Sequence, residues 1–193
     1  MLPEITIQNV VASFMFEPNL DLRRIREAFT EECFFETLTD ERYTFRVVAL
    51  RIKQPRFTFL IYKTGKVVCV GAKTVENAQQ SHRRLLSRLQ EAGINAKFKT
   101  GAKIQNIVAT STLNEEVDLE KFLTKMQKGG RRFHVIYEPE QFPAAILKVS
   151  VNQNTTATIL LFSSGKLVCV GLKTFEHIRK AIRIVISKLS ESE

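Results

Sequence analysis

The sequence predicts an α+β fold in which two copies of one unit, related by a pseudo-two-fold axis, share one antiparallel sheet. The run IQNVVAS at 7–13 returns as IQNIVAT at 104–110, and LIYKTGKVVCVG at 60–71 returns as LLFSSGKLVCVG at 160–171. Offsets of 97 and 100 positions keep both blocks in one order and spacing, which indicates a tandem duplication. Each copy is short and rich in apolar, strand-like runs, so we expect the copies to share a sheet.

The expected repeats span 1–96 and 97–193 within one continuous domain, and each reads as strand, helix, four strands, helix. In the first repeat, residues 5–14 alternate or run apolar and predict a strand. A short helix after Pro18 is marked by Leu20, Leu22, Ile25 and Phe29. Further strands are expected near 31–38, 44–53, 57–63 and 66–72, with a hairpin turn at 63–66.

A long helix closes the first repeat. Thr74 can cap its start, and Gly93 can end it. The side chains expected on its inward stripe are Leu85, Leu86, Leu89 and Ala92.

The second repeat gives the same order. A strand near 103–111 precedes a helix near 117–128, which Gly129 and Gly130 end. Helical spacing places Leu119, Phe122, Leu123 and Met126 on the inward face of that helix. Strands are expected near 133–138, 144–151, 156–162 and 166–172. The last helix starts at Thr174 and is expected to face inward with Ile178, Ala181, Ile182, Val185 and Leu189.

Charge is the one unusual bulk property of the chain. Among 193 residues, 29 Lys and Arg stand against 20 Asp and Glu, a net charge of +9 with a pI near 9.6. This balance favours a polyanionic partner such as nucleic acid, with an acidic membrane surface as the lesser option and a basic protein without such a partner as the third. No run of about 18 apolar residues and no signal-peptide pattern occurs, so we expect a protein that stays inside a cell.

The three cysteines fit a reducing compartment. Cys69 and Cys169 occupy matching positions between valines, which favours small core residues over metal ligands. We expect no metal and no cofactor.

Two strands of the first repeat are apolar on both faces. In residues 58–62 and 67–70, both sets of alternating side chains are largely apolar, although one face of an antiparallel sheet is normally solvated. The helices can cover only one side. The other side is therefore buried by dimerisation or is a binding surface for something flat and partly apolar.

A single amide interrupts the apolar strand at the same place in both repeats, at Asn9 and Asn106. An unpaired buried amide costs roughly 1–3 kcal/mol, so each of these side chains needs a hydrogen-bond partner.

Taken together, these motifs resemble the TATA-binding protein family over nearly the whole chain. The resemblance is carried by the two Gln-Asn strands, by the hairpins around Gly65 and Gly165, and by the run YEPEQFP at 137–143. It implies a saddle: a curved ten-stranded antiparallel sheet, four helices on its convex side and a concave underside on the minor groove of double-stranded promoter DNA. That underside would be the second apolar face.

By the same resemblance, apolar wedges enter base steps at both ends of the site, partly unstack them and kink the duplex. The wedge positions implied here are Phe45, Tyr62, Phe142 and Phe162. Positions implied to meet sugars and base edges are Val11, Leu60, Val68, Val70, Val108, Leu160, Val168 and Val170. Asn9 and Asn106 would lie near the pseudo-dyad and donate to the A N3 and T O2 acceptors of the minor groove. DNA is thus the partner that we favour for these amides.

A rim of cations and hydroxyls would contact phosphates, which supplies affinity and salt dependence but no sequence information. The matching positions are Arg51, Arg56, Thr64, Lys66, Lys73, Lys148, Ser164, Lys166 and Lys173.

Three departures from the family pattern predict a relaxed or shifted TATA preference. Val70 and Val170 stand where the family usually has Thr, so the hydroxyls that meet the central base pairs are missing. Tyr62 replaces one wedge Phe, and inserting its hydroxyl costs desolvation. The basic turn KQPR at 53–56 has no counterpart in NQNT at 152–155.

The resemblance also implies protein partners. Glu138, Glu140 and Gln141 lie where TFIIB-type factors dock, whereas residues 36–42, in the matching stretch of the first repeat, depart further and make a TFIIA-type contact less secure. The expected role is a general transcription initiation factor that binds and bends promoter DNA and recruits a TFIIB-type factor. The alternative is a divergent TATA-binding-protein-related factor that acts mainly as a platform for other proteins.

The chain is not expected to be an enzyme, because it has three histidines and no nucleophile elbow, phosphate loop or metal cluster. DNA glycosylases with a related sheet carry a separate catalytic helical domain, for which no segment of this sequence is left over. We expect a monomer on DNA, with dimerisation of the free chain open. The basic charge favours a nucleus, and the absence of a long N-terminal extension, as in archaeal members, gives the archaeal cytoplasm as the alternative.

Overall fold

Ten strands and four helices are formed by the residues that this computed structural model describes, which are 2–40, 43–126 and 133–190; side chains at 33–40, 43–46, 125–126 and 133 lie outside that description. The first repeat contains β1 (Thr6–Glu17), α1 (Leu22–Ala28), β2 (Cys33–Asp40), β3 (Tyr43–Ile52), β4 (Phe57–Tyr62), β5 (Lys66–Ala72) and α2 (Val75–Glu91). The second contains β6 (Lys97–Thr112), α3 (Leu119–Met126), β7 (Phe133–Ile136), β8 (Ala144–Asn152), β9 (Thr155–Phe162), β10 (Lys166–Leu172) and α4 (Phe175–Ser190). The predicted α+β class and the predicted order of elements are confirmed.

The strands form one sheet in the order β2-β3-β4-β5-β1-β6-β10-β9-β8-β7. Equivalent strands pair in equivalent registers: Ser13 lies opposite Val68 in the first repeat, and Thr110 lies opposite Val168 in the second. The duplication seen in the sequence therefore extends to individual strand contacts.

Two compact units contain these elements, namely unit 1 (residues 1–8 and 106–193) and unit 2 (residues 9–105). Each central strand, β1 and β6, begins in one unit and ends in the other. The division of the sequence into repeats at residue 96 stays a prediction.

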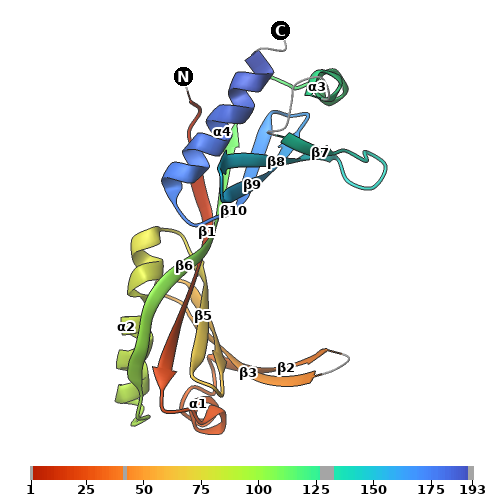
Figure 1. The fold of residues 1–193 in the computed structure, drawn as a ribbon. Coiled ribbons are helices and arrows are strands. Elements are labelled where there is room, and N and C mark those ends of the chain that lie inside the picture. The colour runs from red at the N-terminus through yellow and green to blue at the C-terminus, as the bar shows by residue number, and fades with distance from the viewer. Residues whose placement is uncertain (1, 41–42, 127–132, 191–193) are drawn as a thin grey trace. The chain divides into compact units, whose positions relative to one another are not determined.

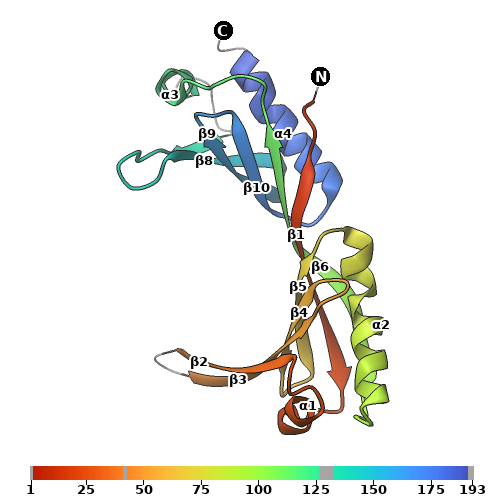
Figure 2. The same cartoon turned by 180° about the vertical axis from the view of Figure 1, so that it is seen from behind.

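Helices cover one face of the sheet in each unit. In unit 2, α2 lies along β5 and α1 lies near β2 and β3; in unit 1, α4 packs on β8, β9 and β10 (Figures 1 and 2). Beneath α2, side chains such as Val10, Ala12 and Phe59 are fully buried. The side chains beneath α4 include Ile159, Leu161 and Cys169, which are also fully buried.

Both described cysteines belong to this core, as the sequence predicted. Cys69 and Cys169 are completely buried. Burial raises the pKa of the Cys69 thiol to about 11, although a hydrogen bond with Ser81 acts in the opposite direction. Burial likewise raises the pKa of Cys169 to about 12, so both thiols are protonated at neutral pH.

Several predicted boundaries and core positions need correction. β6 begins at Lys97, ahead of the predicted residue 103, because its exposed first residues lack the apolar alternation that predicts a strand. Asp21 caps α1 by accepting from two backbone N–H groups, so Leu20 is buried but precedes that helix. Asp118 accepts from the N–H of Lys121 and sets the start of α3 at Leu119, two residues later than predicted.

The predicted inward stripes are correct at their centres only. Leu85 and Leu89 are fully buried, as are the core residues of α4 from Ile178 to Val185. The positions that are only half-buried are Leu86, Ala92, Leu123 and Leu189. The side chain of Met126 and residues 129–130 lie outside the described part of the chain.

No helix in the described residues is long and apolar enough to cross a membrane.

Glycine is required at both hairpin turns. Gly65 and Gly165 have φ of +81° and +77°, and a Cβ at Gly65 would overlap the carbonyl oxygen of Phe16. A close backbone approach also occurs in the second repeat, where a Cβ at Gly165 would overlap the carbonyl oxygen of Glu115.

Replacing Gly65 by Ala is therefore expected to destabilise the fold by at least about 2 kcal/mol, since the left-handed conformation alone costs roughly 1–2 kcal/mol. Gly101→Ala is the matched control, because no atom lies within 4 Å of the Cβ it would add. Urea unfolding measures both variants. Equal effects of the two substitutions would contradict the turn geometry described here.

Candidate nucleic-acid interface

The face of each sheet that the helices leave uncovered is lined by half-buried side chains. Along β1, Val10, Ala12 and Phe14 are fully buried, whereas the alternating Val11 and Ser13 are half-buried. The same alternation runs through β4, β5, β9 and β10. We call the half-buried side the open face of each unit.

Predicted contact residues lie side by side on these open faces. In unit 2, Ser13, Val68 and Leu60 form one row across three strands. Unit 1 repeats it with Thr110, Val168 and Leu160. Opposite residues on one face of a sheet are in direct contact range, so each row is a continuous and mostly apolar strip.

A β-bulge stands at the same place in both units. Between Val10 and Ala12, the register of β5 advances by one extra residue, so Val70 and Gly71 together face Val11. Gly71 has φ of +96°, a conformation open to glycine. β10 has the same irregularity between Cys169 and Leu172, and Gly171 has φ of +88°.

Each bulge holds the asparagine that the sequence singled out. The Gly71 N–H donates to Oδ1 of Asn9 at 2.8 Å, and the Gly171 N–H donates to Oδ1 of Asn106 at 2.9 Å. A backbone N–H can only donate, so these bonds fix which end of each amide is the oxygen. The amide oxygen therefore has its partner within the protein, which the sequence alone did not reveal.

The nitrogen of each amide lies on the open face. Asn9 and Asn106 are half-buried on the same side as Val11 and Val108, opposite the helices. Within the described part of the chain, Nδ2 of neither residue makes a hydrogen bond. Each open face thus carries two N–H donors, held in orientation by a glycine, in apolar surroundings.

Two of the four predicted wedge residues are brought together in unit 1. The rings of Phe142 and Phe162 meet edge to face with centroids 6.1 Å apart. Phe142 is 38% exposed and follows a turn in which its N–H donates to the carbonyl of Glu138. In unit 2, Tyr62 is half-buried on the open face, whereas the side chain of Phe45 lies outside the described residues.

The predicted phosphate-contact positions are all exposed: Arg51, Arg56, Thr64, Lys66, Lys73, Lys148, Ser164, Lys166 and Lys173. Arg51 lies opposite Thr58, and Lys148 lies opposite Thr158. Lys148 is held in place, because its Nζ donates to the Thr158 hydroxyl at 2.8 Å. Thr158 in turn lies opposite Val170, and Thr58 lies opposite Val70 in the other unit. A threonine hydroxyl therefore stands one strand away from each valine.

Further polar groups on β1 and β6 were missed in the sequence. The amide of Gln8 donates to the Thr110 hydroxyl at 2.8 Å, and the amide of Gln105 donates to the Ser13 hydroxyl at 2.7 Å. All four lie within the repeated blocks, so their recurrence at matching positions was the signal available.

The predicted protein-contact residues are also accessible. Glu138, Glu140 and Gln141 are exposed on the turn that leads to β8. In the matching stretch of the first repeat, side chains at 36–40 and residues 41–42 lie outside the described part.

Comparison with known proteins agrees with this architecture. The family model for transcription factor TFIID, or TATA-binding protein, matches residues 4–92 and 101–192. The TATA-box-binding protein of Pyrobaculum aerophilum is 35% identical over 189 residues, which cover 98% of this chain and 87% of that protein. That of Archaeoglobus fulgidus is 33% identical, with coverage of 96% and 94%. The solved structure of Methanococcus jannaschii TBP matches with a TM-score of 0.77 and 31% identity, over 99% of this chain and all of that one.

The hydrogen bond between each asparagine and its bulge can be tested without a ligand. Asn9→Asp keeps an oxygen for the Gly71 N–H, whereas Asn9→Ala removes it and should cost about 1 kcal/mol of stability. Hydrogen exchange should show the Gly71 amide protected in the wild type and in Asn9→Asp, but not in Asn9→Ala. An unprotected Gly71 amide in the wild type would show that Asn9 does not hold the bulge.

Proposed function

The chain belongs to the TATA-binding protein family, which makes it a transcription initiation factor, and from its site we propose that it binds and bends promoter DNA through the minor groove. The observation that carries this proposal is the pair of matching open faces, each apolar and each with an oriented amide donor. Exposed cations flank both faces.

The minor groove of A·T pairs presents acceptors only, at A N3 and T O2. The Nδ2 groups of Asn9 and Asn106 supply donors of the required kind. Valines and leucines beside them fit sugars and base edges, and a G·C pair would place an additional amino group against this apolar surface. Each open face would take one half of such a site.

Phe142 and Phe162 are the wedge that the described side chains support best. They touch each other at the end of the unit 1 open face, and Phe142 keeps a large exposed surface. Inserted into a base step, such a pair partly unstacks it and bends the duplex. Tyr62 would act at the other end together with Phe45, and the tyrosine hydroxyl makes that insertion the weaker one.

Phosphate contacts would come from the flanking cations. Arg56 has no basic counterpart in the second repeat, where the turn after Asn152 is closed by the Asn152 side chain accepting from the N–H of Asn154. The two ends of the site would therefore differ in their number of phosphate contacts.

Weaker discrimination at the centre of the site follows from Val70 and Val170. Both are half-buried on the open face, and neither has a hydroxyl to offer a base. If the loss of discrimination between DNA sequences were large, the chain would act mainly as a platform for other proteins, which is the second candidate function. The intact aromatic pair and the exposed cations favour retained DNA binding.

Recruitment of a TFIIB-type factor through Glu138, Glu140 and Gln141 belongs to the same proposal, and these residues are exposed as it requires. A TFIIA-type contact, binding to DNA as a monomer and a non-enzymatic role are proposed from the family. The relatives named above are archaeal, which favours the archaeal cytoplasm and leaves the predicted nucleus without support.

Substituting the wedge tests the mode of binding. Phe142→Ala should lower the affinity for a TATA duplex about tenfold or more, since base–aromatic contacts are worth roughly 1–3 kcal/mol, and should reduce bending measured by fluorescence transfer between the DNA ends. Phe175→Ala is the matched control, because Phe175 is also 38% exposed but begins α4 on the helical side. The same effect from both substitutions would rule out insertion by Phe142.

Restoring the family hydroxyls tests the specificity. Val70→Thr with Val170→Thr should increase discrimination between TATA and scrambled duplexes by about tenfold, within the roughly 1–3 kcal/mol at stake when an acceptor is left unpaired. Thr58→Val with Thr158→Val removes the neighbouring hydroxyls and separates their contribution. Wild-type discrimination that is already equal to that of an orthodox family member would contradict relaxed specificity.

A further inference from the structure

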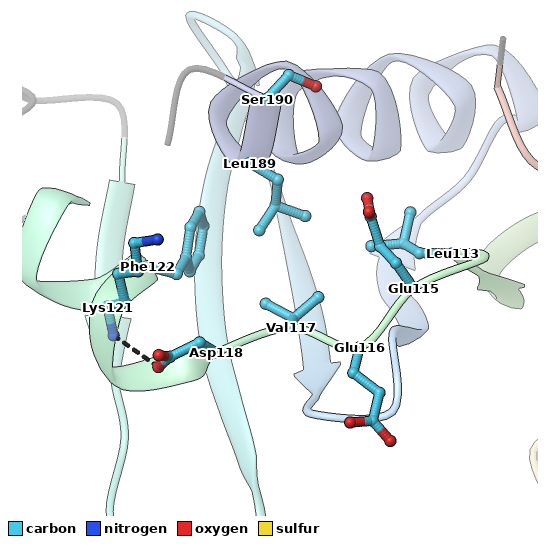
Figure 3. Close-up of a pocket in the computed structure, with 9 residues that line it drawn as sticks. All are labelled: Leu113, Glu115, Glu116, Val117, Asp118, Lys121, Phe122, Leu189 and Ser190. Carbon is cyan, nitrogen blue, oxygen red and sulfur yellow. Dashed lines mark hydrogen bonds between the residues drawn. The ribbon is translucent and has the colours of Figure 1, made fainter. Parts of the chain in front are cut away.

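A cavity of about 190 Å³ opens in unit 1 between the end of α4 and the loop that joins β6 to α3. Leu113, Val117, Phe122 and Leu189 point toward one another across it (Figure 3). Except for Phe122, these apolar side chains are only half-buried, although each lies near the unit's core. The cavity is thus partly apolar, with charged residues among its lining, and it lies away from the open face.

The loop beside this cavity is held by backbone hydrogen bonds. The N–H of Leu113 donates to the Gly165 carbonyl at 3.0 Å, and the N–H of Val117 donates to the Ser163 carbonyl at 2.8 Å. The first repeat has the same two bonds, from Phe16 to Gly65 and from Leu20 to Lys63. These bonds align Phe16 and Leu20 with Leu113 and Val117, although the first loop contains a cis Glu17–Pro18 bond that the second loop does not.

In the first repeat, the equivalent place is filled by the chain itself. After α2, the N–H of Ile94 bonds to the Leu89 carbonyl, and Arg24 of α1 donates to the Gly93 carbonyl. This places the segment 93–96 between the end of α2 and α1. Ile94 and Ala96 are 5% and 3% exposed there.

The covering segment also buries its helix end. Leu89 is fully buried in the first repeat, whereas its counterpart Leu189 is half-buried in the second. Phe98 stacks on Phe16 at 5.6 Å, whereas Leu113, the counterpart of Phe16, is half-buried and lines the cavity. The first repeat thus shows which kind of segment fits: an extended one with apolar side chains.

The charged residues beside the cavity indicate which kind of ligand would bind there. Glu115 and Glu116 stand where the loop of the first repeat has Pro18 and Asn19. Glu115 extends from the loop toward α4, Glu116 points away from the cavity, and Asp118 is occupied in capping α3 (Figure 3). Lys121 also lines the cavity, so Glu115, Glu116 and Asp118 stand there against one cation. In a chain of net charge +9, this local excess of carboxylates favours a basic ligand.

We propose that this cavity is a docking site for an extended, basic and apolar segment of a partner protein. The segment would place one or two apolar side chains between Leu189 and Val117 and a Lys or Arg near Glu115. Residues 191–193 of this chain are Glu-Ser-Glu, a charge opposite to the one required. The proposal goes beyond DNA binding, because the cavity lies outside the open faces.

The first repeat supplies a probe for this site. The capped peptide Gly-Ile-Asn-Ala-Lys-Phe-Lys, which has the sequence of residues 93–99, carries the required apolar side chains and two lysines. Titrated into the ¹⁵N-labelled full chain, it should shift the amide signals of residues 113–122 and 186–190 in a saturable manner. A peptide with both lysines replaced by Glu should bind at least fivefold more weakly.

Variants of the chain test the ionic contacts and the apolar contacts of the proposed site separately. Glu115→Gln with Glu116→Gln should weaken the peptide about fivefold at low salt, as expected for exposed ion pairs, and Val117→Phe should block it by filling the cavity. Glu176→Gln, which removes an exposed carboxylate at the start of α4, is the matched control. Affinity for a TATA duplex should be unchanged in all three variants, so DNA binding is judged separately.

Absence of saturable shifts at millimolar peptide would overturn the proposal. So would shifts confined to other residues, self-association of the chain in place of peptide binding, or equal binding of the lysine and glutamate peptides.

Discussion

One-sided coverage of a sheet that is apolar on both faces is the constraint on which the rest of the structure depends. Side chains such as Val10, Phe59 and Leu161 are fully removed from water by the helices, and this burial stabilises each unit. Their neighbours Val11, Leu60 and Leu160 point the other way and remain half-buried. Exposed apolar strips promote association in water, so a surface of this kind indicates a binding site.

The bulges add a hydrogen-bond donor of fixed orientation to that apolar surface. Gly71 and Gly171 adopt a backbone conformation that releases one N–H from the strand ladder, and an asparagine oxygen accepts it. The consequence is a donor with fixed orientation, which needs no reorganisation when a ligand arrives. Both repeats retain this bulge. Other features differ between them: Tyr62 stands where the second repeat has Phe162, and Leu89 is fully buried whereas Leu189 is half-buried.

Much of this arrangement could be predicted from the sequence because periodicity reports burial. Alternation in β4 and β5 predicted two apolar faces, the family resemblance assigned Leu60 and Val68 to the uncovered one, and the matched positions of Cys69 and Cys169 predicted core residues. The bulge could not be predicted, since a glycine in a strand does not show which side chain accepts its N–H. The cavity at Leu189 escaped prediction as well, because helical spacing places a leucine inward without showing how deeply it is buried.

Recognition from the minor groove is the central claim, and base-pair substitution tests it most directly. Inosine·cytosine pairs present the same minor-groove acceptors as A·T pairs, without the guanine amino group, while their major-groove pattern resembles that of G·C. We predict that a TATA duplex with its A·T pairs replaced by inosine·cytosine keeps its affinity within about threefold, whereas G·C replacement abolishes specific binding. Loss of affinity with inosine·cytosine equal to that with G·C would contradict the account.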